Sequence, residues 1–141
     1  MGMDDPILSW LLEPQDPGVR YLALRHLLEL PASDPELIQA KQVAHHQGPI
    51  CAVLDEMHET GYWVKAGPGY GPKYRSTVWA IILLGQLGAS MEMDERIARA
   101  CQHILDHALT ANGQFSASGR PSDTVDCLQG NLCTALLELG C

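Results

Sequence analysis

Residues 61–88, GYWVKAGPGYGPKYRSTVWAIILLGQLG, decide the fold, because their landmarks recur in residues 113–140. Each stretch opens with a glycine that is followed two positions later by an aromatic residue, and each closes with Leu-Gly. Landmarks that keep one offset indicate a duplicated unit, and periods of this size are typical of helical arrays. The pairs, all 52 residues apart, are Gly61 and Gly113, Trp63 and Phe115, and Leu87-Gly88 and Leu139-Gly140.

The bulk composition indicates one globular domain. The chain has 141 residues, of which 46% are hydrophobic and 18% are charged, and it is rich in Leu and Ala, which favours helices. A net charge of -8 argues against nucleic acid or an anionic membrane surface as the main partner, since both need a basic footprint. The longest apolar run, residues 78–84, is too short for a membrane span.

The cysteines suggest the compartment. There are five, an odd number, and no two of them form a CxxC pair. This pattern fits reduced thiols better than a disulfide framework, so we expect a cytoplasmic protein.

Three Asp-Pro steps mark helix starts in the first third of the chain. Aspartate caps the free amides of a first turn, and proline at the first helical position loses no hydrogen bond. We expect helices over residues 6–12, 17–30 and 35–45, and a fourth that starts after Gly48-Pro49 and carries an apolar stripe over residues 50–57.

Two kinds of helix alternate in the rest of the chain. Residues 76–87 and 125–139 are apolar nearly all round, which predicts buried helices. Residues 94–109 are amphipathic, and His103 falls on the polar face that we expect to point outward. The glycine-rich residues 61–75 and 111–123 are loops. The sequence therefore predicts an all-α fold, an antiparallel α/α hairpin array.

The repeat unit resembles that of the α/α toroid superfamily, which contains squalene and other terpene cyclases and protein prenyltransferase β subunits. Residues 58–63 (HETGYW) and 110–115 (TANGQF) are similar to degenerate forms of the cyclases' Gln-x-x-x-Gly-x-Trp motif. Residues 125–132 (VDCLQGNL) resemble the inner-helix start of small bacterial squalene-cyclase-like proteins, and residues 16–23 (DPGVRYLA) resemble a HEAT-type helix. The resemblance implies one α/α-repeat domain over 1–141, with HEAT-like helices in 1–47 and two toroid-type repeats in 48–141.

The chain departs from that superfamily in two ways. The cyclases protonate substrate with an Asp-x-Asp-Asp cluster, whereas Asp123 and Asp126 here have a different spacing. A full toroid needs about five to seven hairpins, and roughly three are present. We therefore expect a partial toroid, either a fragment of a longer one or an array whose open ends pair with another chain.

A zinc site is one alternative at Asp126 and Cys127. Prenyltransferase β subunits bind zinc through an Asp, a Cys and a distant His. In this chain the third ligand could be His58, His103 or His107. The simpler interpretation is that Asp126 favours a helix N-terminus and Cys127 packs as a small apolar side chain. We expect no cofactor, with zinc as the alternative.

The first loop is the stronger candidate for a ligand site. It combines cations and aromatic rings with glycines that free backbone amides, which suits a phosphate or carboxylate. The simpler alternative is a structural loop with solvated cations and aromatics that pack over the hairpin ends. The candidate residues are Tyr62, Trp63, Lys65, Tyr70, Lys73, Tyr74 and Arg75.

Two functions remain open from sequence. The first is a non-catalytic binding module that holds a small apolar or anionic ligand, or a partner protein, at the rim of the buried helices. The second is an isoprenoid-type enzyme in a longer or oligomeric assembly, with Asp123, Asp126 and Cys127 as acid or metal ligands and Lys73 and Arg75 on a diphosphate. We also expect self-association, because an array cut after a buried helix leaves an apolar face.

Overall fold

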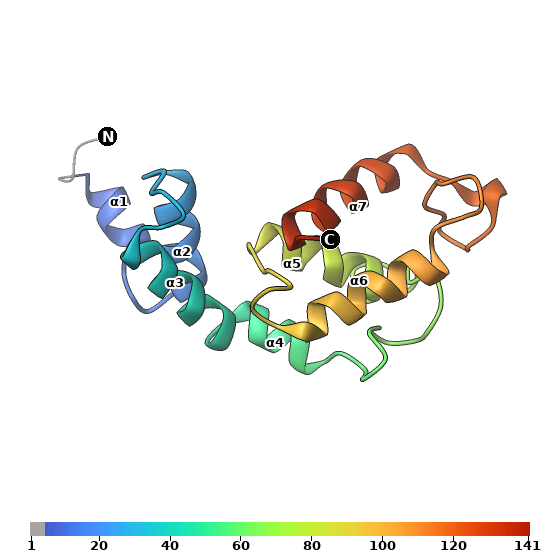
Figure 1. The fold of residues 1–141 in the computed structure, drawn as a ribbon, viewed down its shortest axis with the longest axis horizontal. Coiled ribbons are helices and arrows are strands. Elements are labelled where there is room, and N and C mark those ends of the chain that lie inside the picture. Colours follow the sequence, from blue (N-terminus) through green and yellow to red (C-terminus); the bar gives the residue numbers. More distant parts are fainter. Residues whose placement is uncertain (1–4) are drawn as a thin grey trace. The chain divides into compact units, whose positions relative to one another are not determined.

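A computed structural model describes residues 5–141, and its regular elements are helices (Figure 1). Each helix that the sequence predicts is present, which confirms the all-α class. The toroid arrangement stays a prediction. The helices are α1 (Pro6–Leu11), α2 (Pro17–His26), α3 (Pro35–His46), α4 (Pro49–Asp55), α5 (Thr77–Gln86), α6 (Glu95–His107) and α7 (Asp126–Leu139), with a 3-10 turn at Pro121–Asp123.

The three Asp-Pro steps work as expected. In each case the aspartate carboxylate accepts a backbone N–H of the first turn, and the proline follows at the first helical position. The nitrogen-to-oxygen distance is 2.9 Å from Ile7 to Asp5, 3.2 Å from Val19 to Asp16 and 2.8 Å from Glu36 to Asp34.

Helix α2 is shorter than predicted. It ends at His26, and the N–H groups of Leu28 and Leu30 turn back to the carbonyls of Ala23 and Leu24. Glu29 adopts a left-handed backbone with φ 49°, and Leu30 precedes Pro31, a position that disfavours the helical conformation. The prediction of a helix up to Leu30 is therefore wrong at its C-terminal end.

The chain forms two compact units that divide within α4, one up to Ala52 and one from Val53 to Cys141. In the first unit α2 packs between α1 and α3. Its core joins Tyr21 and Leu24 of α2 to the buried side of α3, which consists of Leu37, Ala40 and Ala44.

The second unit contains both copies of the repeat. The same two backbone hydrogen bonds follow the C-terminal end of α5 in the first copy and of α7 in the second. After α5, the N–H of Gly88 donates to Gly85 O and that of Ala89 to Leu84 O, both at 3.0 Å. After α7, the N–H of Gly140 donates to Leu137 O at 3.1 Å and that of Cys141 to Leu136 O at 2.9 Å. Gly88 and Gly140 have φ 74° and 93°, the left-handed backbone that ends helices with glycine.

The loop starts are equivalent too. Trp63 and Phe115 are both buried, with 4% and 5% of their surface exposed. The N–H of Trp63 donates to the Thr77 hydroxyl at 3.1 Å, and that of Phe115 donates to the Gln129 side-chain carbonyl at 2.7 Å. Thr77 and Gln129 are again 52 residues apart. Equivalent positions of the two stretches therefore make equivalent hydrogen bonds, as a duplicated unit would.

Helices α5 and α7 pack closely side by side (Figure 1). Gly85 permits this approach, because a Cβ atom there would lie 3.1 Å from the Ala135 backbone. The opposite side of α5 is less covered than predicted, since Leu83 is 42% exposed and Trp79 and Ile82 are half-buried. The expectation of a helix buried on most sides therefore holds for only part of its circumference.

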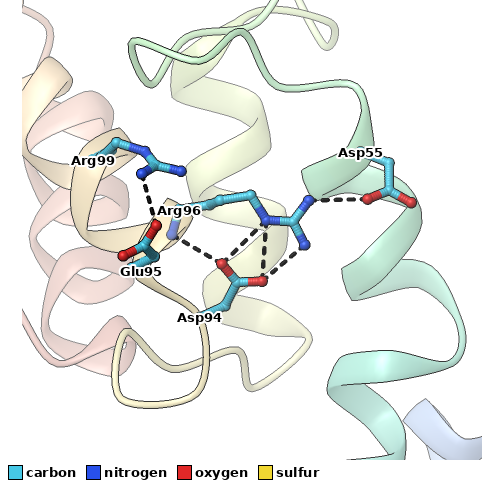
Figure 2. A network of polar contacts seen from close by, with 5 residues as sticks. All are labelled: Asp55, Asp94, Glu95, Arg96 and Arg99. Atoms are coloured by element: carbon cyan, nitrogen blue, oxygen red, sulfur yellow. Dashed lines mark hydrogen bonds and ion pairs between the residues drawn. The ribbon is translucent and has the colours of Figure 1, made fainter.

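A polar network connects the start of α6 to the end of α4 (Figure 2). The Arg96 guanidinium donates to both Asp94 oxygens and, at 2.9 Å, to Asp55. These hydrogen bonds, to Asp94 above all, raise the pKa of Arg96 further above its already high value. One turn on, Arg99 pairs with Glu95 at 3.0 Å.

The cysteine prediction is wrong for one pair, because Cys101 of α6 and Cys141 form a disulfide across 40 residues of sequence. Spacing along the chain does not predict it, because only the tertiary structure brings the two residues together. Cys127 and Cys133 on α7 are exposed and lie outside this bond. Within residues 5–141 the helices are all too short or too polar to cross a bilayer.

Candidate functional site

The loop between α4 and α5 covers the start of α5. The carbonyl of Gly69 accepts the N–H of Val78 at 3.0 Å, so the loop supplies part of the cap that the first turn of α5 needs. The Ser76 hydroxyl donates to the carbonyls of Gly69 and Pro72 at 2.7 and 2.9 Å. The loop is thus pinned to the helix by its backbone, which leaves its long side chains for other contacts.

The seven predicted ligand residues do not form one site. Trp63 is part of the core, where its indole N–H donates to Val53 O at 2.7 Å. Lys65 and Arg75 are exposed. The other four divide between two groups, Tyr62 against α6 and Tyr70, Lys73 and Tyr74 against α5.

The first group is a row of four rings. Tyr62 stacks on His58 at 4.4 Å between centroids and tilts against His103 at 5.4 Å. His103 in turn lies 4.3 Å from His107, one helical turn along α6. Beside this row lies an open pocket of about 350 Å³, lined by Thr60, Ala66, Arg99, Gln102, His103, Asp106 and His107.

The prediction that His103 points to solvent is wrong, because only 7% of the residue is exposed. Its Nε2 lies 3.1 Å from Gly67 O and donates to that carbonyl, so the ring fastens the loop to α6. Burial lowers the pKa of His103, and the neighbouring His107 lowers it further, while the hydrogen bond to Gly67 opposes the shift. The amphipathic pattern of α6 does not predict this contact, because it cannot show that the loop between α4 and α5 covers His103 on the polar side of the helix.

The second group, which we call the aromatic cluster, consists of Tyr70, Lys73, Tyr74 and Trp79. The rings of Tyr70 and Tyr74 lie 5.4 and 4.8 Å from Trp79 between centroids, tilted by 56° and 57°. Such tilted pairs are favourable ring geometries. The Trp79 indole N–H donates to Tyr70 O at 2.8 Å, which fixes the plane of the indole against the loop.

Tyr74 reaches this cluster in an unusual backbone conformation. Its φ is 65°, in the left-handed region that costs an L-residue about 1–2 kcal/mol. Its side chain is 72% exposed nonetheless, so burial of Tyr74 does not account for the conformation. Uncommon backbone geometry of this kind is concentrated at functional sites, which makes the cluster a candidate.

Trp79 belongs to the cluster but is not among the seven predicted residues, because the apolar pattern of residues 76–87 predicts a buried helix. The available signal was the repeat itself. The position 52 residues after Trp79 is Asn131, and those after Tyr70 and Tyr74 are Ser122 and Asp126. The aromatic residues are thus specific to the first copy.

The predicted catalytic and metal residues lie around the start of α7. Asp123 accepts a hydrogen bond from the Ser118 hydroxyl, and Asp126 and Cys127 are exposed in the first turn. Across residues 5–141, no three His, Cys, Asp or Glu side chains gather in a way that could hold a metal ion.

Comparison with known proteins returned no match to a family model, to a curated protein or to a solved structure.

Proposed function

We propose that residues 53–141 are a non-catalytic helical-repeat binding module, related to the prenyltransferase and squalene-cyclase superfamily, which holds a small molecule or partner protein at the N-terminal rim of α5. The aromatic cluster is the observation that carries the proposal. It places three rings and one ammonium group at the surface, and Tyr74 is mostly exposed there.

The second repeat supports this assignment, because it closes an equivalent loop without such residues. There the Ser116 hydroxyl donates to Arg120 O at 2.6 Å, and bridges join Leu109 to Phe115 and Ser116 to Thr124. Since small polar side chains suffice for closure, the rings of the aromatic cluster are not required by the repeat's architecture and can serve binding.

Indole NMR signals test the proposal. The chain has three tryptophans, so a protein labelled with ¹⁵N at the indole nitrogens gives separate reporters for Trp79, for the core at Trp63 and for the first unit at Trp10. We expect some member of a fragment set that spans anions, cations and neutral apolar compounds to shift the Trp79 signal and leave the Trp10 signal in place. If no fragment moves Trp79, the rim is not a binding site.

The isoprenoid-enzyme alternative remains a separate hypothesis for Asp123, Asp126 and Cys127. Metal analysis of the purified protein tests its zinc version: one zinc per chain that is lost in Cys127→Ser would favour it over the binding module.

Self-association is proposed on the exposed apolar side chains of the second unit. Leu137 of α7 is 73% exposed and Leu83 of α5 is 42% exposed. Sedimentation velocity at increasing protein concentration measures it, and Leu137→Glu should lower the average mass if α7 provides the contact.

A further inference from the structure

The aromatic cluster already holds a cation, which is the protein's own Lys73. The Nζ atom of Lys73 lies 5.1 Å from the centroid of the Tyr74 ring and 5.8 Å from that of the Trp79 ring. Both distances are within the range of about 6 Å over which an aromatic face attracts a positive charge. The side chain therefore marks where a cation is stable against this surface.

The distances describe the size of the cation that fits. A methyl carbon touches a ring atom at about 3.5–4.0 Å. A single bond from that carbon to nitrogen adds about 1.45 Å. A methylated nitrogen thus stands roughly 5 Å from a ring that its methyl group touches. The nitrogen of Lys73 lies at about that distance, 5.1 Å, from the centroid of the Tyr74 ring, so a methyl group on a nitrogen at this place would touch the ring.

We infer that the notch between Tyr74 and Trp79 binds a methylated ammonium group, and that Lys73 is its internal, replaceable occupant. The inference rests on the proposed function and names its ligand class. Quaternary ammonium groups are recognised by aromatic faces because they combine a diffuse positive charge with an apolar surface. The net charge of -8 favours a cationic ligand over the anion expected from Lys65, Lys73 and Arg75.

Access to the notch is open. Tyr74 is mostly exposed, and a lysine side chain can swing from an exposed ring into water at little cost. Trp79 is held from behind by its hydrogen bond to Tyr70 O, so the indole keeps its orientation when Lys73 leaves. A ligand that displaces Lys73 therefore meets a fixed indole face at Trp79 and the exposed ring of Tyr74.

Choline titration followed at the Trp79 indole signal tests the inference, with 3,3-dimethylbutanol as the neutral compound of the same shape. We expect choline to bind in the millimolar range and to shift Trp79, and dimethylbutanol to bind at least about threefold more weakly, since it lacks the charge. Equal affinities of the two compounds, or tighter binding of pyrophosphate at the same signal, would overturn the cationic assignment.

Three variants locate the effect. Tyr74→Leu removes an exposed ring and should weaken choline binding by about threefold or more. Lys73→Gln removes the occupant and should strengthen it by a similar factor. Lys65→Gln changes the net charge equally, at an exposed position of the same loop outside the cluster, and should have little effect. If Lys65→Gln strengthens binding as much as Lys73→Gln does, the change in net charge alone explains the effect. The inference that Lys73 occupies the site is then refuted.

These outcomes separate the inference from the proposed function. Fragments that shift Trp79 while choline does not would retain the rim as a binding site and reject its ligand class. Where choline binds, phosphatidylcholine vesicles identify the source of the group: sedimentation with vesicles that choline reverses indicates a lipid headgroup, and no sedimentation indicates a free small molecule.

Discussion

The two loops of the second unit, residues 61–76 and 113–128, start from the same scaffold and differ in what they carry. Each begins at a glycine with positive φ, buries an aromatic residue two positions later, and ties that residue's N–H to a side chain at the start of the following helix. The first loop then presents Tyr70, Lys73 and Tyr74, which form the aromatic cluster with Trp79 of α5. The second loop is closed by hydrogen bonds from the Ser116 hydroxyl to Arg120 O and from the Ser118 hydroxyl to Asp123.

The difference separates architecture from function. Features present in both loops are those that the repeat needs in order to fold, because each copy must bury one aromatic residue and pair its backbone N–H. Features present in one loop have no such explanation. By this criterion Trp63 belongs to the architecture, whereas Tyr70, Tyr74 and Trp79 are the residues to examine for binding.

The largest expected effect is a difference in stability between alanine substitutions at Gly61 and at Gly113, the glycines that open the two loops. A Cβ at Gly61 would lie 2.4 Å from the Arg99 carbonyl oxygen, whereas a Cβ at Gly113 would meet no atom within 4 Å. Both have positive φ. We expect Gly113→Ala to cost about 1 kcal/mol for its backbone conformation alone. Gly61→Ala should cost about 3 kcal/mol or more, because α6 must also move. Urea unfolding followed at the Trp63 indole measures both, and equal losses would contradict the close approach.

The next effect compares the two acceptors at the helix starts. Thr77 is fully buried, so Thr77→Val leaves the Trp63 N–H without a partner and should cost about 2 kcal/mol. Gln129 is only half-buried, and water can replace part of its hydrogen bonds to the N–H and the carbonyl of Phe115, so Gln129→Met should cost about 1 kcal/mol. The same unfolding measurement applies. A smaller loss for Thr77→Val than for Gln129→Met would contradict the expectation that burial of the acceptor sets the cost of losing the bond.

A pH dependence should distinguish the first loop, because His103 fastens only that loop to α6. The folded-state pKa of His103 lies below its ordinary value, so the unfolded chain takes up the proton first as the pH falls. Stability from this group is present above about pH 6.5, the ordinary histidine value, and decreases as the pH drops below it.

Unfolding at several pH values from neutral downward, compared between the wild type and His103→Gln, measures this contribution. The variant should be less stable at neutral pH but should lose less stability on acidification. His46→Gln, at an exposed histidine of the first unit, is the matched control and should follow the wild type. Parallel curves for the wild type and His103→Gln would exclude the mechanism.

The smallest effect concerns two exposed ion pairs, one between α4 and α6 and one within α6 (Figure 2). The Asp55 carboxylate is 63% exposed where it meets Arg96, so Asp55→Asn should cost less than about 1 kcal/mol. Added salt should reduce this cost, since it screens exposed charges. Glu95 is 84% exposed, and Glu95→Gln should change stability by no measurable amount. A loss for Asp55→Asn that salt leaves unchanged would mean that its hydrogen bonds, rather than its charge, connect the helices.

Much of this molecule follows from local chemistry. Each Asp-Pro step predicts a helix start because cap and proline act within one turn, and Leu-Gly predicts both helix ends because glycine tolerates the left-handed backbone. The offset of 52 residues was visible in the chain itself, and it extends to Thr77 and Gln129, two residues of different type that accept the same bond.

The site required the tertiary structure. The seven residues chosen from the first loop shared only their position in sequence, and folding sends Trp63 into the core, Tyr62 to α6 and Lys73 to a ring of α5. The burial of His103 and the bond between Cys101 and Cys141 likewise depend on segments far apart in the chain. Helix starts and ends are determined by neighbours within a few residues, so the sequence alone determined them. Which side chains meet across loops depends on how whole helices pack, and only the tertiary structure decided that.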